Sequence, residues 1–274
     1  MTATEPFPSL PPWLVAGRKN VPARVRPFGA APEHLAIDFH LARRPELVTD
    51  LLALCCFASD GAPADYDVLL DLPVGIRICA LIVLAAASDP NAMSWQVHCS
   101  SDGCAQQNEF ELNTAQLVAL AQERLEEQTI LVPIGTIMAS LKRPTGRDQL
   151  QWLEADEDMS EAMLRAVVVE PRLDELRATG MTSETIAIAV DAAMDSFDPL
   201  LSFHVRVRCP GCGAVADVAP DLAAAAIERL SRAQHAAIGD VHRLASRYHW
   251  SEIEILNLPQ WRRQSYLDLI EGGA

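Results

Sequence analysis

The spacing of hydrophobic residues along the chain predicts a mostly helical protein. The clearest helix lies near the C-terminus, where apolar residues from Ile227 to Tyr248 fall at helical spacing. A continuous apolar run from Ile78 to Ala87 predicts a buried helix, because it is about half of the ~20 residues that a membrane span requires. Further helices are expected over residues 46–52, 115–127, 160–169, 183–196 and 259–272.

Short strands are expected where apolar and polar positions alternate. Two pairs of such strands each enclose a turn that begins and ends with cysteine, and a helix follows each pair. The paired strands are residues 94–98 with 108–112 and residues 203–208 with 214–218, and one further strand is expected over residues 136–143. Because the order strand, cysteine turn, strand, helix occurs twice, we interpret residues 68–130 and 200–270 as two pseudo-repeats.

Proline distinguishes the start of the chain from the rest. Residues 1–45 hold 8 of the 18 prolines, and proline both fixes φ and removes a hydrogen-bond donor. We therefore expect an extended arm, which is either a loose terminus or a segment that lies over a neighbouring subunit and buries residues such as Val25 and Phe28 there. Residues 46–270 are expected to form one α+β domain, in which a helical connection over 145–199 joins the two pseudo-repeats.

Two helix starts carry the sequence signature of a capping box. In this motif a Ser or Thr and an acidic residue three positions later each satisfy the other's backbone N–H. Thr145 with Asp148 and Ser251 with Glu254 have this spacing. A helix is expected to begin at each position.

The seven cysteines point to a metal site and not to disulfide bonds. Their number is odd, no secretory signal opens the chain, and four of them form two close pairs, so a reducing cytosol is the expected compartment. Cys55, Cys56 and Cys79 lie in apolar surroundings and are expected to be packed as small hydrophobic residues.

Zinc held only by protein side chains prefers four tetrahedral ligands, and cysteine thiolate is its usual structural partner. Cys99, Cys104, Cys209 and Cys212 supply these four ligands, which gives a zinc ribbon built from two hairpins. A glycine next to each pair, Gly103 or Gly213, frees the backbone to turn under the ion. The competing interpretation is four reduced thiols without a metal.

Histidines offer two weaker candidates for metal ligands. His98 is a spare ligand beside Cys99. His242 and His249 are seven residues apart, which would place them on one face of a helix, but solvated histidines are the simpler interpretation.

Charge and motifs exclude several classes of function. A formal net charge of -15 disfavours binding to nucleic acid or to an anionic membrane, both of which need a clustered cationic face. The sequence has no Gly-x-Gly-x-x-Gly after a strand, no Walker loop, no Gly-x-Ser-x-Gly and no His-Glu-x-x-His. We therefore predict no catalytic residues, no cofactor besides structural Zn²⁺, and no small-molecule substrate.

Several segments together resemble one protein family. They are Leu72-Pro-Val-Gly75-Ile-Arg77, Glu109-Phe-Glu-Leu112, Arg143-Pro-Thr145 with Asp148-Gln-Leu150, Cys209-Pro-Gly-Cys212-Gly213, Val241-His-Arg-Leu244-Ala245, Tyr248-His-Trp250-Ser251-Glu252, Glu254-Ile-Leu256, Arg262-Arg263 and Tyr266-Leu267. The pattern is similar to the baseplate proteins of contractile phage tails and of phage-derived contractile injection systems. This family is often labelled a baseplate hub subunit or hub assembly chaperone, after the T-even phages.

The resemblance implies a structural component of a contractile tail baseplate. Its partners would be other baseplate, hub or sheath-initiator subunits, and it would be found in the bacterial cytoplasm during assembly and then in the particle. One alternative is an assembly chaperone that is absent from the mature particle. Another, of a different class, is a zinc-ribbon adaptor or enzyme of the cytosol.

Overall fold

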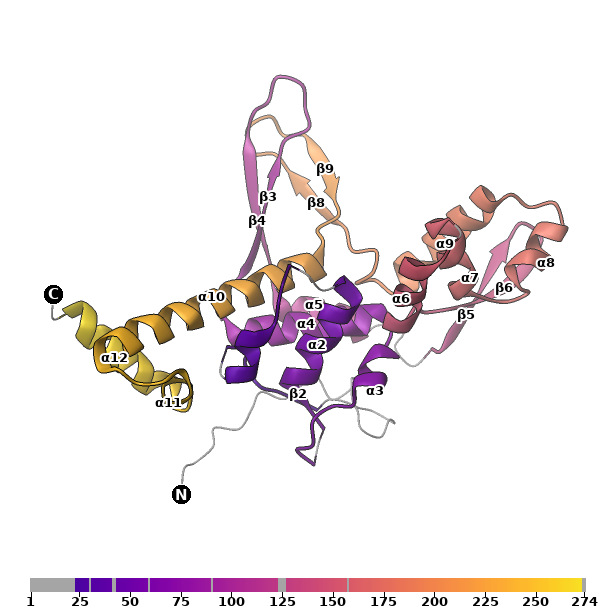
Figure 1. Cartoon of the computed structure of the whole chain (residues 1–274). Coiled ribbons are helices and arrows are strands. Elements are labelled where there is room, and N and C mark those ends of the chain that lie inside the picture. Colours follow the sequence, from indigo (N-terminus) through magenta and orange to yellow (C-terminus); the bar gives the residue numbers. More distant parts are fainter. Residues whose placement is uncertain are drawn as a thin grey trace. The chain divides into compact units, whose positions relative to one another are not determined.

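The computed structural model describes residues 23–29, 31–40, 43–58, 60–89, 91–122, 127–156 and 158–272. Its fold is mixed α+β with about 54% helix and 18% strand, which confirms the expected predominance of helices (Figure 1). The chain divides into two compact units. Unit 1 comprises the described residues up to Tyr66 together with 81–91 and 223–272, and unit 2 comprises residues 67–80 and 92–222. This division differs from the expected boundaries, because segments distant in sequence alternate between the units.

Unit 1 is built mainly from helices. Its elements are β1 (Arg24–Val25), η1 (Pro32–Ala36), α2 (Arg44–Cys55), β2 (Cys56–Phe57), α11 (Glu252–Leu256), α12 (Gln260–Gly272), the second half of α4 (Val74–Ser88), and α10 (Leu222–Tyr248) from its second residue on. The proline-rich segment lies outside the described residues up to residue 22. From Ala23 on it belongs to the fold, since β1 pairs antiparallel with β2 and both Val25 and Phe28 are buried. The proposal that these two side chains are available to a neighbouring subunit is therefore wrong.

A histidine is buried in unit 1 without charge. The His34 ring stacks on Phe28, and its Nδ1 accepts a hydrogen bond from the Gly29 backbone N–H at 2.9 Å. Its Nε2 lies 3.7 Å from Cys55 Sγ. Burial first, and then the charge of Arg26, lower the pKa of His34 from 6.5 to about 4. His34 is therefore neutral in the folded protein at neutral pH.

Unit 1 is expected to lose stability as the pH falls from about 6.5 towards 4. In the unfolded chain His34 takes up a proton near pH 6.5, whereas in the folded protein it does so only near pH 4, so acid favours the unfolded state. Between pH 7 and pH 4.5 this linkage amounts to on the order of 2–3 kcal/mol. The His34→Asn variant keeps an acceptor for Gly29 and cannot titrate. Urea unfolding at both pH values should show a smaller loss in the variant, and equal losses would contradict the linkage.

The C-terminal helices α10, α11 and α12 share a small cluster of buried side chains. Leu244, Ile255 and Leu267 form its centre, and Tyr248, Trp250 and Tyr266 pack around it with ring centroids 4.8 to 5.4 Å apart. The expected capping box between Ser251 and Glu254 is present at the start of α11.

His249 ends the long helix α10 and does not extend it. Its φ is 57°, in the left-handed region, and α10 stops at Tyr248. The expectation that His242 and His249 share a helical face is therefore wrong, and both side chains are exposed.

Unit 2 holds every described strand except β1 and β2. Its helices are α3 (Tyr66–Leu70) from its second residue on, the first half of α4, α5 (Thr114–Gln122), α6 (Gly146–Glu154), α7 (Met159–Val167), α8 (Leu173–Ala178) and α9 (Ser183–Phe197). Its strands are β3 (Met93–His98), β4 (Gln107–Leu112), β5 (Thr129–Ile134), β6 (Ile137–Lys142), β7 (Val168–Glu170), β8 (Val205–Arg208) and β9 (Val215–Val218). Among the described residues no helix combines the length and the hydrophobicity that crossing a bilayer demands.

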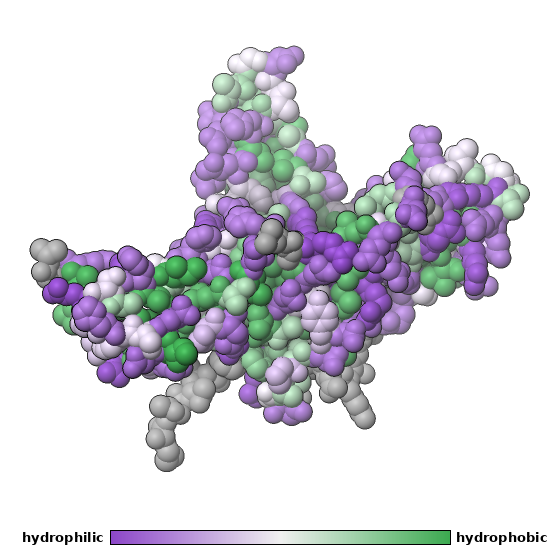
Figure 2. All heavy atoms as spheres, in the orientation of Figure 1, coloured by the Kyte–Doolittle hydropathy of each residue, from purple (hydrophilic) through white to green (hydrophobic). Residues whose placement is uncertain are grey.

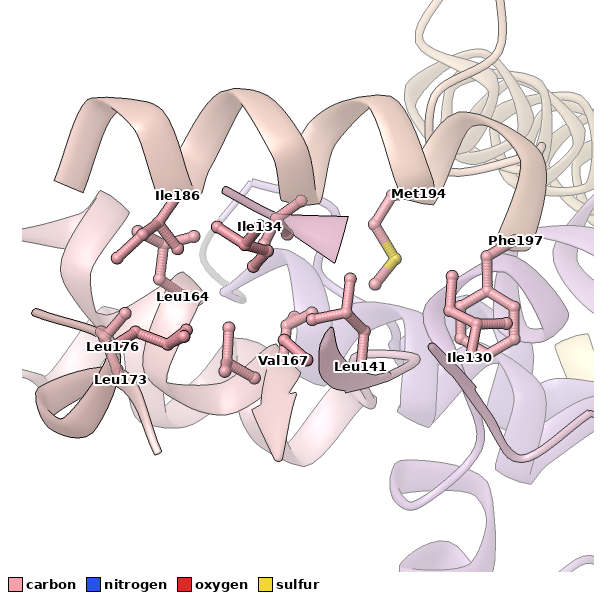
Figure 3. Close-up of a cluster of buried hydrophobic side chains, with 13 residues drawn as sticks. Ile130, Ile134, Leu141, Leu164, Val167, Leu173, Leu176, Ile186, Met194 and Phe197 are labelled. Carbon is pink, nitrogen blue, oxygen red and sulfur yellow. The ribbon is translucent and has the colours of Figure 1, made fainter. Parts of the chain in front are cut away.

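The main core of unit 2 lies between a three-stranded sheet and α9 (Figure 3). The sheet has the antiparallel order β5-β6-β7, and side chains such as Ile134 and Leu141 from the sheet meet Ile186, Met194 and Phe197 from α9. The sequence predicts only β6 of these strands. Strand β5 lies at the sheet edge and contains Pro133. Strand β7 follows α7 without a break in the apolar run. Neither strand therefore shows the alternation of apolar and polar residues that predicts a strand.

Residues 72–77 and 143–150 lie side by side in unit 2. The Val74 N–H donates to the Pro144 carbonyl at 2.8 Å, and Pro73 and Thr145 form an antiparallel bridge. The expected capping box between Thr145 and Asp148 opens α6. These segments therefore join the start of α4 to the start of α6.

Two glycines allow buried charged groups to approach this junction. A Cβ on Gly146 would lie 2.4 Å from the guanidinium of Arg77, which is fully buried and donates to the Leu69 carbonyl at 2.8 Å. A Cβ on Gly75 would lie 1.8 Å from Asp198 Oδ1. Burial raises the pKa of Asp198 to about 6, while Arg143 and the Gly75 N–H oppose the rise.

Candidate metal centre

Two β-hairpins of unit 2 carry the predicted cysteine turns. In β3–β4 and β8–β9 one face holds the less exposed side chains and the other face is exposed, as the alternating pattern predicted. Trp95 and Phe110 stack across the first hairpin with ring centroids 5.8 Å apart. Figure 1 shows the two hairpins next to each other, and in Figure 2 hydrophobic residues lie between hydrophilic flanks on them.

The first cysteine turn is closed by backbone hydrogen bonds. The Cys99 N–H donates to the Gln106 carbonyl at 2.9 Å, and the Cys104 N–H donates to the Ser101 carbonyl at 3.1 Å. Gly103 has a φ of 77°, which a residue with a side chain rarely adopts. The role expected for this glycine in the turn is therefore confirmed.

The second turn repeats this arrangement with a shorter loop. The Cys209 N–H donates to the Ala214 carbonyl at 2.8 Å, and the Gly213 N–H donates back to the Cys209 carbonyl at 2.9 Å. Gly213 has a φ of 75°. Both cysteines of each pair are thus held at the tip of a hydrogen-bonded hairpin.

The four thiols meet although the two pairs are far apart in sequence. The Sγ atoms of Cys99, Cys104, Cys209 and Cys212 all lie within 4.8 Å of one another. Two of these distances cross between the hairpins, at 3.6 Å from Cys99 to Cys212 and 3.7 Å from Cys104 to Cys209. A tetrahedral site with metal–sulfur bonds of ~2.3 Å has sulfur–sulfur edges of about 3.8 Å. The arrangement is therefore compatible with one tetrahedral metal ion.

Backbone donors favour the ionised form of the second pair. The N–H groups of Cys212 and Gly211 lower the pKa of Cys209 to about 6, and the Ala214 N–H is the first cause that lowers the pKa of Cys212. The Gln106 N–H acts to lower the pKa of Cys104, but the neighbouring thiols, Cys212 first, and burial raise it to about 11. Four thiols so close together cannot all ionise without a cation, and a bound metal would supply that charge.

The remaining candidates do not join the site. His98 is exposed and is not part of the cysteine group, so its role as a spare ligand gains no support. Cys55, Cys56 and Cys79 are fully buried free thiols, as expected, and burial raises the pKa of Cys55 and of Cys79 to about 12. These three thiols are therefore packing residues.

Sequence reasoning missed one contact between the two turns. The position of a Cβ on Gly211 is 3.5 Å from Gln106 Cβ and 3.8 Å from Cys104 Sγ. A Cβ there would make ordinary van der Waals contacts, so the second turn lies close to the first at this position.

Comparison with known proteins adds no relative: no family model, no curated protein and no solved structure matches the chain.

Proposed function

We propose that the four cysteines hold a structural Zn²⁺ ion and that the chain is a scaffold subunit that binds other proteins. The observation that carries this proposal is the convergence of two cysteine hairpins whose ligands are 105 positions apart, with thiol spacings that suit a tetrahedron. Four thiolates select zinc or iron, and zinc fits a role without redox chemistry. A site with four protein ligands has no open position for water, which favours a clamp over a hydrolytic centre.

The assembly in which this scaffold serves is proposed to be the baseplate of a contractile phage tail or injection system. The support is the resemblance of the segments named above, together with the structural use of those segments. Residues 72–77 and 143–150 pair with each other and bury Arg77 and Asp148, and residues 209–213 form a cysteine turn. Segments used in this way suit a rigid platform whose partners are baseplate, hub or sheath-initiator subunits.

Metal analysis tests the first part of the proposal. Purified protein should contain one zinc ion per chain by elemental mass spectrometry, and a strong chelator should remove it together with the hairpin structure. Iron in place of zinc, or an apoprotein with fully ordered hairpins, would contradict the structural zinc site.

Particle purification tests the second part. The chain should co-purify at fixed stoichiometry with sheath and tube proteins when a tagged sheath subunit is isolated from the host. Presence only during assembly would favour the hub assembly chaperone. Absence at both stages would favour a cytosolic zinc-ribbon adaptor or enzyme.

A further inference from the structure

The four cysteines of the candidate metal centre are also placed to react with one another. Sγ of Cys99 lies 3.6 Å from Sγ of Cys212, and Sγ of Cys104 lies 3.7 Å from Sγ of Cys209. A disulfide bond is about 2.05 Å long, so the two sulfurs of each pair need to approach by about 1.6 Å. Each thiol belongs to one pair and each pair joins the two hairpins, so both bonds can form in one molecule.

Exposure to solvent ranks the four thiols for an oxidant that arrives from water. Cys212 is exposed, Cys99 and Cys104 are half-buried, and Cys209 is buried. Oxidation of cysteine follows the exposure and the thiolate character of each sulfur. A small oxidant therefore meets Cys212 first, and Cys99 lies at contact distance to form the first bond. In the second pair Cys104 meets the oxidant before Cys209 does.

We propose that this site is redox-responsive, and that hydrogen peroxide converts it into two disulfides, Cys99–Cys212 and Cys104–Cys209. The proposal rests on the structural zinc site proposed above, because zinc keeps its four ligands as thiolates and the thiolate is the nucleophile in each step. A disulfide offers the ion no thiolate, so Zn²⁺ leaves as the bonds form. Oxidation thus exchanges a metal clamp for a covalent one.

Each disulfide forms in two steps that consume one molecule of peroxide. The Cys212 thiolate attacks one peroxide oxygen, the O–O bond breaks and hydroxide leaves, which gives a sulfenic acid. The Cys99 thiolate then attacks that sulfur, forms the S–S bond and expels a second hydroxide. Two electrons pass from the two sulfurs to the peroxide. Cys104 and Cys209 react with a second peroxide in the same way.

The three other cysteines are shielded from this reaction. Cys55, Cys56 and Cys79 are fully buried, so a dissolved oxidant does not reach them in the folded protein. They should stay reduced while the four exposed or half-buried members of the metal centre react. The chain therefore carries its own internal control.

The pairing decides what oxidation does to the hairpins. Disulfides within each hairpin would leave the two hairpins unconnected once Zn²⁺ is lost, and an isolated two-stranded hairpin is marginal in water. Disulfides that cross between the hairpins keep them joined without the ion. The oxidised protein should therefore retain the hairpin structure that the reduced protein loses when a chelator removes the metal.

Peptide mapping of the oxidised full chain tests the pairing. Of the seven cysteines, three should still react with N-ethylmaleimide in denaturant after two equivalents of hydrogen peroxide per chain. One equivalent should yield mainly Cys99–Cys212. Trypsin without reductant should then release residues 78–124 joined to residues 209–229, because neither range contains a Lys or Arg before its last residue.

A second cleavage and a control variant complete the assignment. Cleavage before Asp102 separates Cys99 from Cys104, and fragmentation of the linked peptides between Cys209 and Cys212 identifies each bond. Cys79→Ala removes the third cysteine of residues 78–124 and should give the same two disulfides. Any other pairing of the four cysteines, a bond to a buried cysteine, or sulfinic acid in place of disulfides would overturn the proposal.

Zinc release and hydrogen exchange test the exchange of clamps. A colorimetric zinc indicator should report one ion released per chain after two equivalents of peroxide, and dithiothreitol with added Zn²⁺ should reverse the release. The amides of β3, β4, β8 and β9 should exchange at least about tenfold more slowly in the oxidised protein than in the reduced, chelator-treated protein. Equal exchange in the two states, or zinc that stays bound after both disulfides form, would overturn the proposal. Zinc content before oxidation decides the proposed zinc site, so the two proposals can fail separately.

Discussion

Replacing Cys209 by serine is expected to abolish metal binding and to unfold both cysteine hairpins, while the sheet that packs on α9 stays folded. Cys209 is the buried member of the four thiols. Its loss leaves three ligands and removes the thiolate that the backbone best stabilises.

If the proposed zinc ion is bound, the two hairpins should depend on it, because they bury little apolar surface. Among the residues of β3, β4, β8 and β9 only Met93 and Asn108 are buried. Isolated two-stranded hairpins are marginal in water, whereas a structural zinc ion contributes about 10 kcal/mol or more. The sheet with α9 has a cluster of 13 buried residues, which can persist without the metal.

Hydrogen exchange combined with metal analysis measures this effect. In Cys209→Ser the amides of residues 93–112 and 205–218 should lose protection, and those of β5, β6 and α9 should keep it. Cys79→Ala removes a buried thiol from α4 and should retain the metal. Full metal content, or unchanged protection of the hairpins in Cys209→Ser, would show that the thiols are not the clamp.

The Gly75→Ala variant is expected to destabilise unit 2 by about 4 kcal/mol. The new methyl group would lie 1.8 Å from Asp198 Oδ1, so the carboxylate must move. Asp198 is buried and accepts a hydrogen bond from the Gly75 N–H at 3.3 Å, and displacing it loses that bond and strains the surrounding packing. Urea unfolding followed by circular dichroism measures the change.

Two further variants separate this clash from a general intolerance of alanine. Gly239 lies inside α10, and within the described residues no atom beyond its own stretch of helix lies within 4 Å of the place that an added methyl group would take. Gly239→Ala should therefore stabilise its helix by about 0.5–1 kcal/mol. Adding Asp198→Ala to Gly75→Ala removes the clashing carboxylate, and the double variant should be less destabilised than the sum of the single variants. If the double variant is destabilised by the sum of the two single effects, the assigned contact between position 75 and Asp198 is refuted.

The candidate metal site could be predicted from the sequence because its information is local. A cysteine pair with a glycine beside it predicts a turn whatever the surrounding fold. A structural zinc ion takes four ligands and each turn supplies two, so two such turns must meet to form the predicted site. The capping boxes at Thr145 and Ser251 were predictable for the same reason, since each motif lies within four residues.

The rest of unit 2 depends on contacts that no local pattern encodes. Strand β7 continues the apolar run of α7, and its pairing with β6 ends the helix at Val167, two residues before the expected end. The sequence also gives no sign that Arg77 and Asp198 are buried, because charged residues usually stay in water. Only the close approach of Gly146 and Gly75 in the folded structure makes room for them.

The end of α10 in unit 1 shows the same limit. The helical spacing of the apolar residues continues up to Tyr248, and the capping box at Ser251 indicates only that α10 ends before that residue, not that His249 is the one that leaves the helix. Its left-handed backbone accompanies the stacking of Tyr248 on Trp250, which is a contact across the bend. The helical prediction for His249 therefore fails for a reason that lies in the packing.

Pro133 affects how readily the open edge of the β5-β6-β7 sheet could pair with another molecule. Strand β5 lies at the end of its sheet, and its exposed Leu131 would invite a strand from another molecule to continue the ladder. Proline has no N–H to offer such a strand, so an incoming chain cannot form an uninterrupted row of bonds along this side. Replacing Pro133 would thus remove a safeguard against amyloid-like stacking. Because proline has no backbone N–H, the folded molecule would lose no hydrogen-bond donor.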